Sequence, residues 1–308
     1  MEGFFLEQSA LFLQQLVNGV TLGGIYALIA VGYTMVYGVI QLINFAHGEI
    51  YMFGAFLSFS LLTGFFGPSL PFAVAVPLAV LICAGAGVLL DVIAYRPLRR
   101  SPRLAALITA IGMSIFLQNL ALLIWGGQIK AFPRGVIPAF LFETALEMGE
   151  VSVGWLQVIV LLVAMILMLI LQLVVHYTRT GRAMRAIAQD QIAAALMGVN
   201  VDRVVSYTFA LGSALGAVAG ILVALYYNAV YPTMGYFAGI KAFAAAVLGG
   251  IGSIPGAILG GAILGLAEVF GGGYISSAYS DGIAYAVMIL VILVKPNGIF
   301  GRRIKDKA

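Results

Sequence analysis

Long apolar runs, separated by short polar segments, occupy most of this sequence. A helix needs about 20 mostly apolar residues to cross ~30 Å of hydrocarbon, and nine runs meet or approach that length. The predicted spans cover residues 11–33, 44–66, 70–91, 104–125, 153–176, 204–227, 237–253, 254–270 and 276–295. The pattern therefore predicts an all-α fold, a polytopic transmembrane helical bundle with about eight or nine spans, some of them broken or re-entrant.

Glycine and proline interrupt the helical pattern at two places. Residues 64–71 hold two glycines and two prolines, and they predict a short turn at the membrane surface. Residues 248–256 lie between the two shortest predicted spans, which form either two crossings or one re-entrant pair. Broken helices in transporters commonly lie beside the substrate path, so Gly249 and Gly250 are predicted to belong to a moving element there.

Glycines also recur at four-residue spacing within two of the predicted spans. The two sets are Gly212, Gly216 and Gly220, and Gly252, Gly256 and Gly260. Each set forms a smooth strip on one helix face, and such strips let helix backbones approach closely in lipid. Tight helix packing is therefore predicted at both.

The composition restricts the class of protein further. Hydrophobic residues make up 62% of the 308 positions and charged residues only 9%, whereas a soluble domain is roughly 45–50% apolar. The net charge of +4 does not indicate a nucleic-acid partner, because the basic residues lie in short segments between apolar runs. Cys83 is the only cysteine, which excludes an intrachain disulfide and a thiolate metal site. We expect a single membrane domain over residues 1–308, in contact with lipid.

The basic residues also predict the orientation in the membrane. Most of them fall into three groups: Arg96, Arg99, Arg100 and Arg103; Arg179, Arg182, Arg185 and Arg203; and Lys295, Arg302, Arg303, Lys305 and Lys307. The positive-inside rule places these segments in the cytoplasm, and an even number of predicted spans separates successive groups, as one shared side requires. The N-terminus is then outside and the C-terminus cytoplasmic. Residues 126–152 form the one sizeable outer loop.

A polar cluster at Asn44-Phe-Ala-His-Gly-Glu49 interrupts a chain that otherwise has no charge from Leu11 to Leu90. An ionisable side chain at bilayer depth costs at least ~2.5–3.5 kcal/mol, so it persists mainly where it lines a cavity or pathway. The predicted translocation residues are therefore Asn44, His47, Glu49 and Lys241, with Gly249 and Gly250 close by.

Other roles remain open for these ionisable groups. Each could be a helix-end residue that reaches the interface or a hydrogen-bonding group between helices, and for Glu268, near the outer end of its span, that role is favoured. Glu49 and Lys241 could also pair with each other as a gate.

Catalytic and metal sites are not supported. The chain has no Gly-x-x-x-x-Gly-Lys-Ser/Thr phosphate loop, so any dependence on ATP must come from a partner. His47 and Glu49 are two residues apart, which places them on different faces of a helix, and the only other histidine is His176. We therefore expect no catalytic residue, no metal and no cofactor in this chain.

The segment from about residue 178 to 203 is too polar to cross the membrane. Its small residues and its apolar Ile187, Ile192, Leu196 and Met197 give a partly amphipathic helical pattern. A solvated loop whose arginines only set the topology is one interpretation. The other is a short coupling helix that docks into a groove on a cytoplasmic partner. The residues assigned to this coupling loop are Arg182, Arg185, Ala186, Ala194 and Gly198.

Four segments together resemble a known family. They are Asn44–Glu49, Ala105–Asn119, Gly181–Ala186 and the long glycine-rich Lys241–Gly256, and all are similar to the branched-chain amino acid ABC transporter permeases of the LivH type. The similarity runs from about Leu11 to Gly301, with departures mainly in residues 126–152 and 271–282.

This resemblance implies a transport subunit in the bacterial inner membrane. The implied partners are a second related permease subunit, two cytoplasmic ABC ATPases that bind ATP and Mg²⁺, and a periplasmic or lipoprotein substrate-binding protein. The implied cargo is leucine, isoleucine and valine.

A second function class stays open on the residues alone. The chain could be a self-sufficient ion-coupled secondary transporter or channel for small amino acids or amides, in which Glu49 and Lys241 would be the ion-coupling groups. The cytoplasmic coupling loop and the missing phosphate loop favour the ATP-driven importer.

Overall fold

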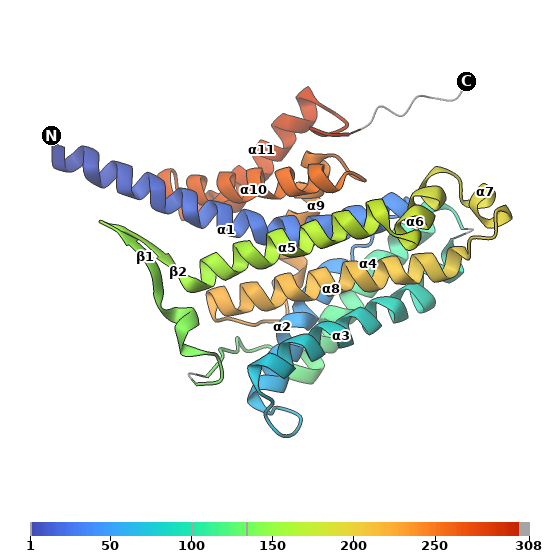
Figure 1. Ribbon diagram of the computed structural model, residues 1–308, viewed down its shortest axis with the longest axis horizontal. Coiled ribbons are helices and arrows are strands. Elements are labelled where there is room, and N and C mark those ends of the chain that lie inside the picture. The colour runs from blue at the N-terminus through green and yellow to red at the C-terminus, as the bar shows by residue number, and fades with distance from the viewer. Residues whose placement is uncertain (1, 100, 134, 302–308) are drawn as a thin grey trace.

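The computed structural model describes residues 2–99, 101–133 and 135–301, and nearly all regular structure in them is helical (Figure 1). The α-helices are α1 (Glu2–Ile40), α2 (His47–Thr63), α3 (Phe72–Leu90), α4 (Arg103–Trp125), α5 (Trp155–Tyr177), α6 (Arg179–Gln189), α7 (Gln191–Leu196), α8 (Val201–Tyr227), α9 (Met234–Gly249), α10 (Ile254–Tyr274) and α11 (Ser280–Val294). A π-helical turn, η1 (Asp91–Tyr95), and a 3₁₀ turn, η2 (Arg96–Leu98), extend α3. Two further 3₁₀ turns are η3 (Ala139–Phe142) and η4 (Ser277–Tyr279).

Seven of the described helices are long and apolar enough to cross a membrane, and α9 is a shorter apolar helix. This confirms the prediction of a polytopic transmembrane helical bundle. With 16 residues, α9 is about 24 Å long, which is less than the ~30 Å of hydrocarbon. The helix α2 is also short, at 17 residues. These two short helices are the broken elements of the bundle.

The first two helices differ from their predicted bounds. The predicted span 11–33 is part of α1, which continues to Ile40 and ends where Gln41 adopts a positive φ of 54°. The predicted span 44–66 begins later, because α2 starts only at His47. Residues 41–46 therefore form a non-helical entry into α2, inside the bundle.

Close helix approach is built from glycine, as the sequence predicted, except at Gly252, which lies in the turn before α10 and has no atom within 4 Å of an added Cβ. A methyl group added at Gly220 of α8 would overlap the carbonyl group of Tyr51 on α2. A methyl group added at Gly260 of α10 would likewise overlap the carbonyl group of Ala245 on α9. The helices α2 and α9 cross at Gly48 and Gly235, where no side chain separates the backbones. Small residues at such crossings let helices pack by van der Waals contact, which is what holds helices together in lipid.

The core is buried around α1, which α8, α9 and α10 pack against. The outer helices α4 and α11 instead leave large apolar side chains exposed along their length. An exposed apolar surface of this extent is typical of a protein that contacts lipid or another membrane subunit.

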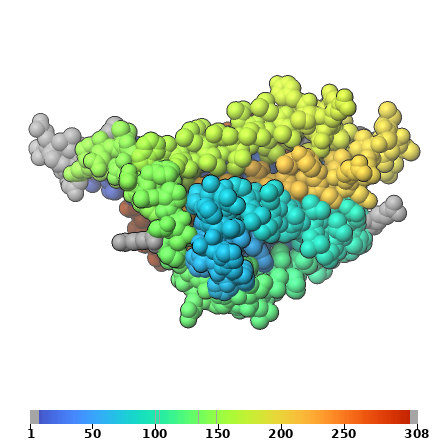
Figure 2. All heavy atoms as spheres, turned by 60° about the horizontal axis from the view of Figure 1, so that its bottom comes forward, coloured from blue at the N-terminus to red at the C-terminus, as the bar shows by residue number. Residues whose placement is uncertain are grey.

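The two ends of the bundle differ in structure. The loop predicted at 126–152 contains a hairpin of β1 (Thr144–Met148) and β2 (Val151–Gly154), whose turn uses Gly149 at a φ of 63°. Figure 1 shows this hairpin at the same end as the start of α1, and α6 and α7 at the opposite end. Figure 2 shows the yellow atoms of α7 protruding beyond the ends of the long helices. The arginine-rich segment and the predicted outer loop therefore lie at opposite ends, as the charge pattern requires.

Candidate functional site

The start of α2 carries a buried polar cluster. Asn44, His47 and Glu49 are each almost fully buried, although Ala46, the N-cap residue of α2, provides no side-chain hydrogen bond. The three predicted residues therefore lie inside the protein, around the start of α2. Each side chain contacts a different group of helices.

Asn44 contacts the extension of α3. The hydroxyl group of Tyr95 in η1 donates a hydrogen bond of 2.8 Å to Oδ1 of Asn44. Tyr95 is itself fully buried and packs against Phe209 of α8. The non-helical entry into α2 is thus attached to the π-helical turn by a single polar contact.

His47 lies in a cradle made by glycines of two helices. A methyl group at Gly32 of α1 would be 2.5 Å from Nε2 of the imidazole, and one at Gly216 of α8 would be 3.4 Å from Cε1. The ring of Tyr33 meets the imidazole edge to face, with 4.7 Å between ring centroids. Glycine at these positions creates the space that the imidazole occupies.

Glu49 points between α4 and α9. The hydroxyl group of Ser114 donates a hydrogen bond of 2.9 Å to Oε1, and Oε2 lies beside Gly235. His47 and Glu49 therefore face different helices, as expected for residues two positions apart.

Several polar atoms of this cluster have no hydrogen-bond partner among the described residues. They are Nδ2 of Asn44, Nε2 of His47 and Oε2 of Glu49. A buried polar atom left unsatisfied costs about 1–3 kcal/mol, and native proteins satisfy nearly all such atoms with protein groups or ordered water. The start of α2 is therefore suited to bind water or a polar ligand.

Lys241 is not part of this cluster. Its Nζ lies 2.8 Å from Oε1 of Glu268 and 2.7 Å from Oδ1 of Asp281, and Tyr26 donates a hydrogen bond of 2.9 Å to Oε2 of Glu268. The alternative in which Lys241 pairs with Glu49 as a gate is therefore not formed in this structure. Glu268 forms hydrogen bonds between helices, which is one of the two roles that the sequence favoured for it.

The helical rotation of α9 explains the separation. Glu49 meets α9 at Gly235, and the six residues from there to Lys241 turn the helix by about 600°, which leaves the two positions about 120° apart. Lys241 therefore faces α10 and α11, and its ion pairs join α9 to both helices.

Gly249 and Gly250 form the turn between α9 and α10, with Gly250 at a φ of 106°. The amide groups of Ile299 and Phe300 donate hydrogen bonds of 3.0 and 2.9 Å to the carbonyl groups of Leu248 and Gly249. The segment that follows α11 thus binds the carboxyl end of α9. No local sequence pattern indicates this contact, because it joins residues about 50 positions apart.

A small cavity separates this turn from the start of α2. Its volume is about 10 Å³, and Tyr37, Ile43, Phe243 and Ile251 are among the residues that line it. This is about the space that one water molecule needs. In this conformation the turn and the entry into α2 are therefore close neighbours with little free space between them.

The predicted coupling loop forms two capped helices. Thr178 accepts a hydrogen bond from the amide of Gly181 at the start of α6, and Asp190 accepts from the amides of Ile192 and Ala193 at the start of α7. Gly198 ends the segment at a φ of 85°. The sequence predicted one helix over Ala186–Gly198. The cap at Asp190 instead divides the segment into two.

The arginines and alanines of this loop have different positions. Arg182 is exposed, whereas the guanidinium of Arg185 donates to the carbonyl groups of Val175 and His176 at the end of α5. Ala186 is half-buried, and Ala194 is buried against the start of α8. Ala194 therefore packs within the chain, where its small side chain lets α7 lie close to the bundle, and it offers no exposed surface of the coupling loop.

The exposed face of α7 is apolar. Ile192 is 75% exposed, and Leu196 and Met197 are each 84% exposed. Large apolar side chains at the protruding end of the bundle (Figure 2) form a surface that a protein partner can bind. We call Ile192, Leu196 and Met197 the α7 face.

Comparison with known proteins agrees with this architecture. The chain is 48% identical over 301 residues to the high-affinity branched-chain amino acid transport system permease protein LivH of Salmonella typhimurium, with 96% of this chain and 97% of the relative covered. It is 45% identical to the corresponding permease protein BraD of Pseudomonas aeruginosa, with 94% and 96% covered. The permease protein LivM of the Salmonella typhimurium system is 28% identical, with 92% of this chain and 69% of the relative covered.

A family model described as the permease component of the branched-chain amino acid transport system matches residues 15–292. The matched region contains the start of α2, the Lys241 ion pairs, and both α6 and α7. The chain therefore belongs to the family of branched-chain amino acid transport system permease components.

Proposed function

We propose that this chain is the transmembrane permease subunit of an ATP-driven importer of branched-chain amino acids. The observation that carries the proposal is the identity of 48% over nearly the whole length to a permease of that transport system. The buried polar cluster at the start of α2 supports a transport role, because unsatisfied polar atoms inside a membrane bundle need a polar partner.

The cluster of Asn44, His47 and Glu49 borders the translocation pathway in this proposal. A zwitterionic amino acid needs polar partners at both ends, and the free donors and acceptors of the cluster supply them. Since the cavity beside it holds only about one water molecule, passage requires the glycine turn at Gly249 and Gly250 to move. Lys241 supports the pathway by holding α9, which carries Gly235 beside Glu49.

The remaining parts of the importer are separate proteins. A second related permease completes the pathway, which is supported by the similarity of this chain to both LivH and LivM of one Salmonella system. Two cytoplasmic ATPases bind ATP and Mg²⁺ and dock on the α7 face, and a substrate-binding protein delivers the amino acid on the other side. This chain supplies no catalytic residue of its own.

The α7 face provides a direct test of ATPase docking. Replacing Leu196 or Met197 with aspartate should weaken ATPase binding about tenfold or more, because each change puts a charge into a buried apolar contact. Binding of purified ATPase subunits to the detergent-solubilised chain measures the effect.

The matched control for these variants is Gln189→Asp, which adds the same charge at an exposed position of α6. It should bind ATPase normally. Normal binding by Leu196→Asp and Met197→Asp as well would remove α7 as the docking element.

The orientation follows from the same proposal, with the N-terminus outside and α7 in the cytoplasm. Cysteines introduced at the exposed Ser152 and Met197 should label from opposite sides of sealed vesicles, and the native Cys83 is buried and stays unreactive. Labelling of both from one side would contradict the topology. Lys305, the predicted cytoplasmic marker near the C-terminus, lies outside the described residues.

The cargo is tested with the co-purified complex. Leucine, isoleucine and valine, loaded on the binding protein, should stimulate ATP hydrolysis, and small amides or acidic amino acids should not. Stimulation by amides alone would keep the importer but change its substrate class.

A further inference from the structure

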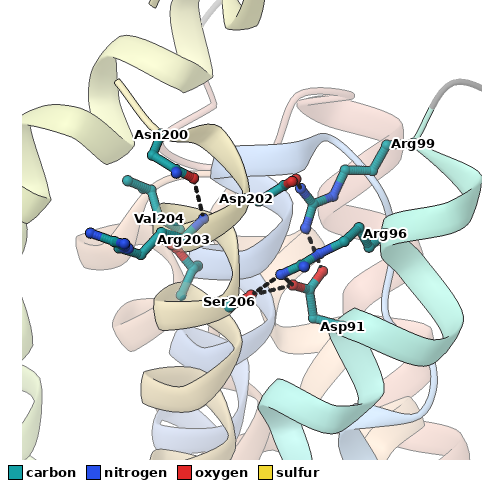
Figure 3. Close-up of polar contacts among 9 residues, drawn as sticks. Asp91, Arg96, Arg99, Asn200, Asp202, Arg203, Val204 and Ser206 are labelled. Carbon is teal, nitrogen blue, oxygen red and sulfur yellow. Dashed lines mark hydrogen bonds and ion pairs between the residues drawn. The ribbon is translucent and has the colours of Figure 1, made fainter. Parts of the chain in front are cut away.

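A charged network joins the end of α3 to the start of α8 (Figure 3). Asp91, the first residue of η1, is fully buried. Nη2 of Arg99 lies 2.6 Å from its Oδ1, and the hydroxyl group of Ser206 donates a hydrogen bond of 2.7 Å to its Oδ2. Arg96 donates a hydrogen bond of 2.9 Å to the same hydroxyl group. A buried carboxylate must be paired to be tolerated, so this network fixes η1 to α8.

Arg99 extends the network to the first turn of α8, where it pairs with Asp202. That turn begins at Asn200, which caps α8 by accepting a hydrogen bond from the amide of Arg203. The preceding residue, Val199, donates its amide to the carbonyl of Ala194 in α7. A displacement of α7 therefore reaches Asp202 and Arg99 through one continuous, capped backbone segment.

The other end of the π-helical turn η1 contacts the polar cluster at the start of α2. Tyr95, the last residue of η1, donates a hydrogen bond to Asn44 at the entry to α2. Ala194, Val205 and Phe209 belong to the hydrophobic cluster that also buries Tyr95. Thus η1 contacts α8, which directly follows the α6–α7 segment, and it also contacts the buried cluster.

The turn itself is suited to move. π-helical turns are rare and are frequently found at functional sites. Nε of Arg96 and Nε of Arg99 are buried without a hydrogen-bond partner among the described residues, which leaves hydrogen-bonding capacity for a second arrangement of the same side chains.

We propose that Asp91, Arg99 and Tyr95 are positioning residues that transmit movement of the α6–α7 segment to Asn44 and the start of α2. This inference rests on the proposed function, because the movement is the one that ATPase binding to the α7 face imposes. Asp91 and Arg99 hold η1 to the first turns of α8, and Tyr95 passes the displacement to the entry of α2.

The test uses the complete complex in proteoliposomes and measures ATP hydrolysis and labelled leucine uptake together. Asp91→Asn removes the charge that binds Arg99, and Tyr95→Phe removes only the hydroxyl group bound to Asn44. Each should lower leucine uptake per ATP hydrolysed about three- to thirtyfold, while ATPase binding stays normal. Tyr177→Phe, at an exposed position outside the network, is the matched control.

A double variant separates transmission from stability. If Asp91 and Tyr95 act in one relay, Asp91→Asn with Tyr95→Phe should lower the ratio no further than the stronger single variant. A ratio equal to wild type in Tyr95→Phe, which keeps the buried ring and folds even if Asp91→Asn does not, would overturn the proposal. Failure of the proposed function gives a different result, because the wild-type complex itself would then show no ATP-driven uptake. A normal ratio in Tyr95→Phe would overturn only the relay.

Discussion

Substitution of Gly220 by valine is expected to prevent correct assembly of the bundle. A side chain at this position meets the backbone carbonyl of Tyr51 rather than a flexible side chain, so α2 and α8 would have to separate. Overpacking a well-packed core costs about 1–3 kcal/mol and more where backbones must shift, and α2 carries His47 and Glu49 of the polar cluster. The yield of monodisperse protein in detergent should fall sharply, and the thermal midpoint of any recovered protein should be lower.

The matched control is Gly112→Val on α4. No atom lies within 4 Å of the added Cβ at that position, so the variant should behave like the wild type. Equal behaviour of the two variants would contradict the packing of α2 against α8.

Substitution of Lys241 by methionine is expected to have the second largest effect. The change leaves the carboxylate of Glu268, whose side chain is 12% exposed, without its cation. Breaking a buried ion pair by removing one partner costs about 3–5 kcal/mol, which is an upper bound for this partly buried pair. The thermal midpoint should fall, and leucine uptake should fall with it because α9 loses its attachment to α10 and α11. Asp281 is half-exposed, so water hydrates its carboxylate once Lys241 is replaced. The unpaired carboxylate of Glu268 therefore accounts for most of the lost stability.

A second substitution tests the cause. Glu268→Gln should restore part of the stability of Lys241→Met, because it removes the unpaired charge. Lys295→Met, at an exposed position, is the control and should leave the midpoint unchanged. A Lys241→Met protein as stable as wild type would show that these ion pairs contribute little to the bundle.

The helices and their close crossings could be predicted from the sequence because both depend on local patterns. Apolar runs of about 20 residues mark spans, and glycine at four-residue spacing marks a smooth face, as found at Gly216 and Gly220. The polar cluster at the start of α2 was predictable for a similar reason, since a charged group at bilayer depth is costly wherever it lies.

The partners of the charged groups could not be predicted in the same way. Whether Lys241 pairs with Glu49 or Glu268 depends on the rotation of α9 and on which helices pack beside it. Neither the rotation nor the neighbouring helices can be predicted from a local sequence pattern. Asp91 gave even less signal, because a carboxylate at the end of an apolar run, before a group of arginines, is typical of a helix end at the membrane surface. Its burial depends on Ser206, 115 residues away.

The coupling segment shows a third limit. Periodicity identified the amphipathic pattern around Ile192 and Leu196, but it did not decide which face is exposed. The short side chain of Ala194 suits either a groove on a partner or close packing within the chain. The structure shows packing within the chain, and it leaves the apolar α7 face exposed.

Uptake of labelled leucine into proteoliposomes tests the central claim most directly. The vesicles contain this chain with its permease partner and ATPases, and the binding protein is added on the side opposite the ATPases. We predict leucine uptake that requires ATP, persists when ion gradients are collapsed, and is lost in the Leu196→Asp variant. Leucine uptake by this chain alone, driven by an ion gradient without ATP or ATPase, would contradict it.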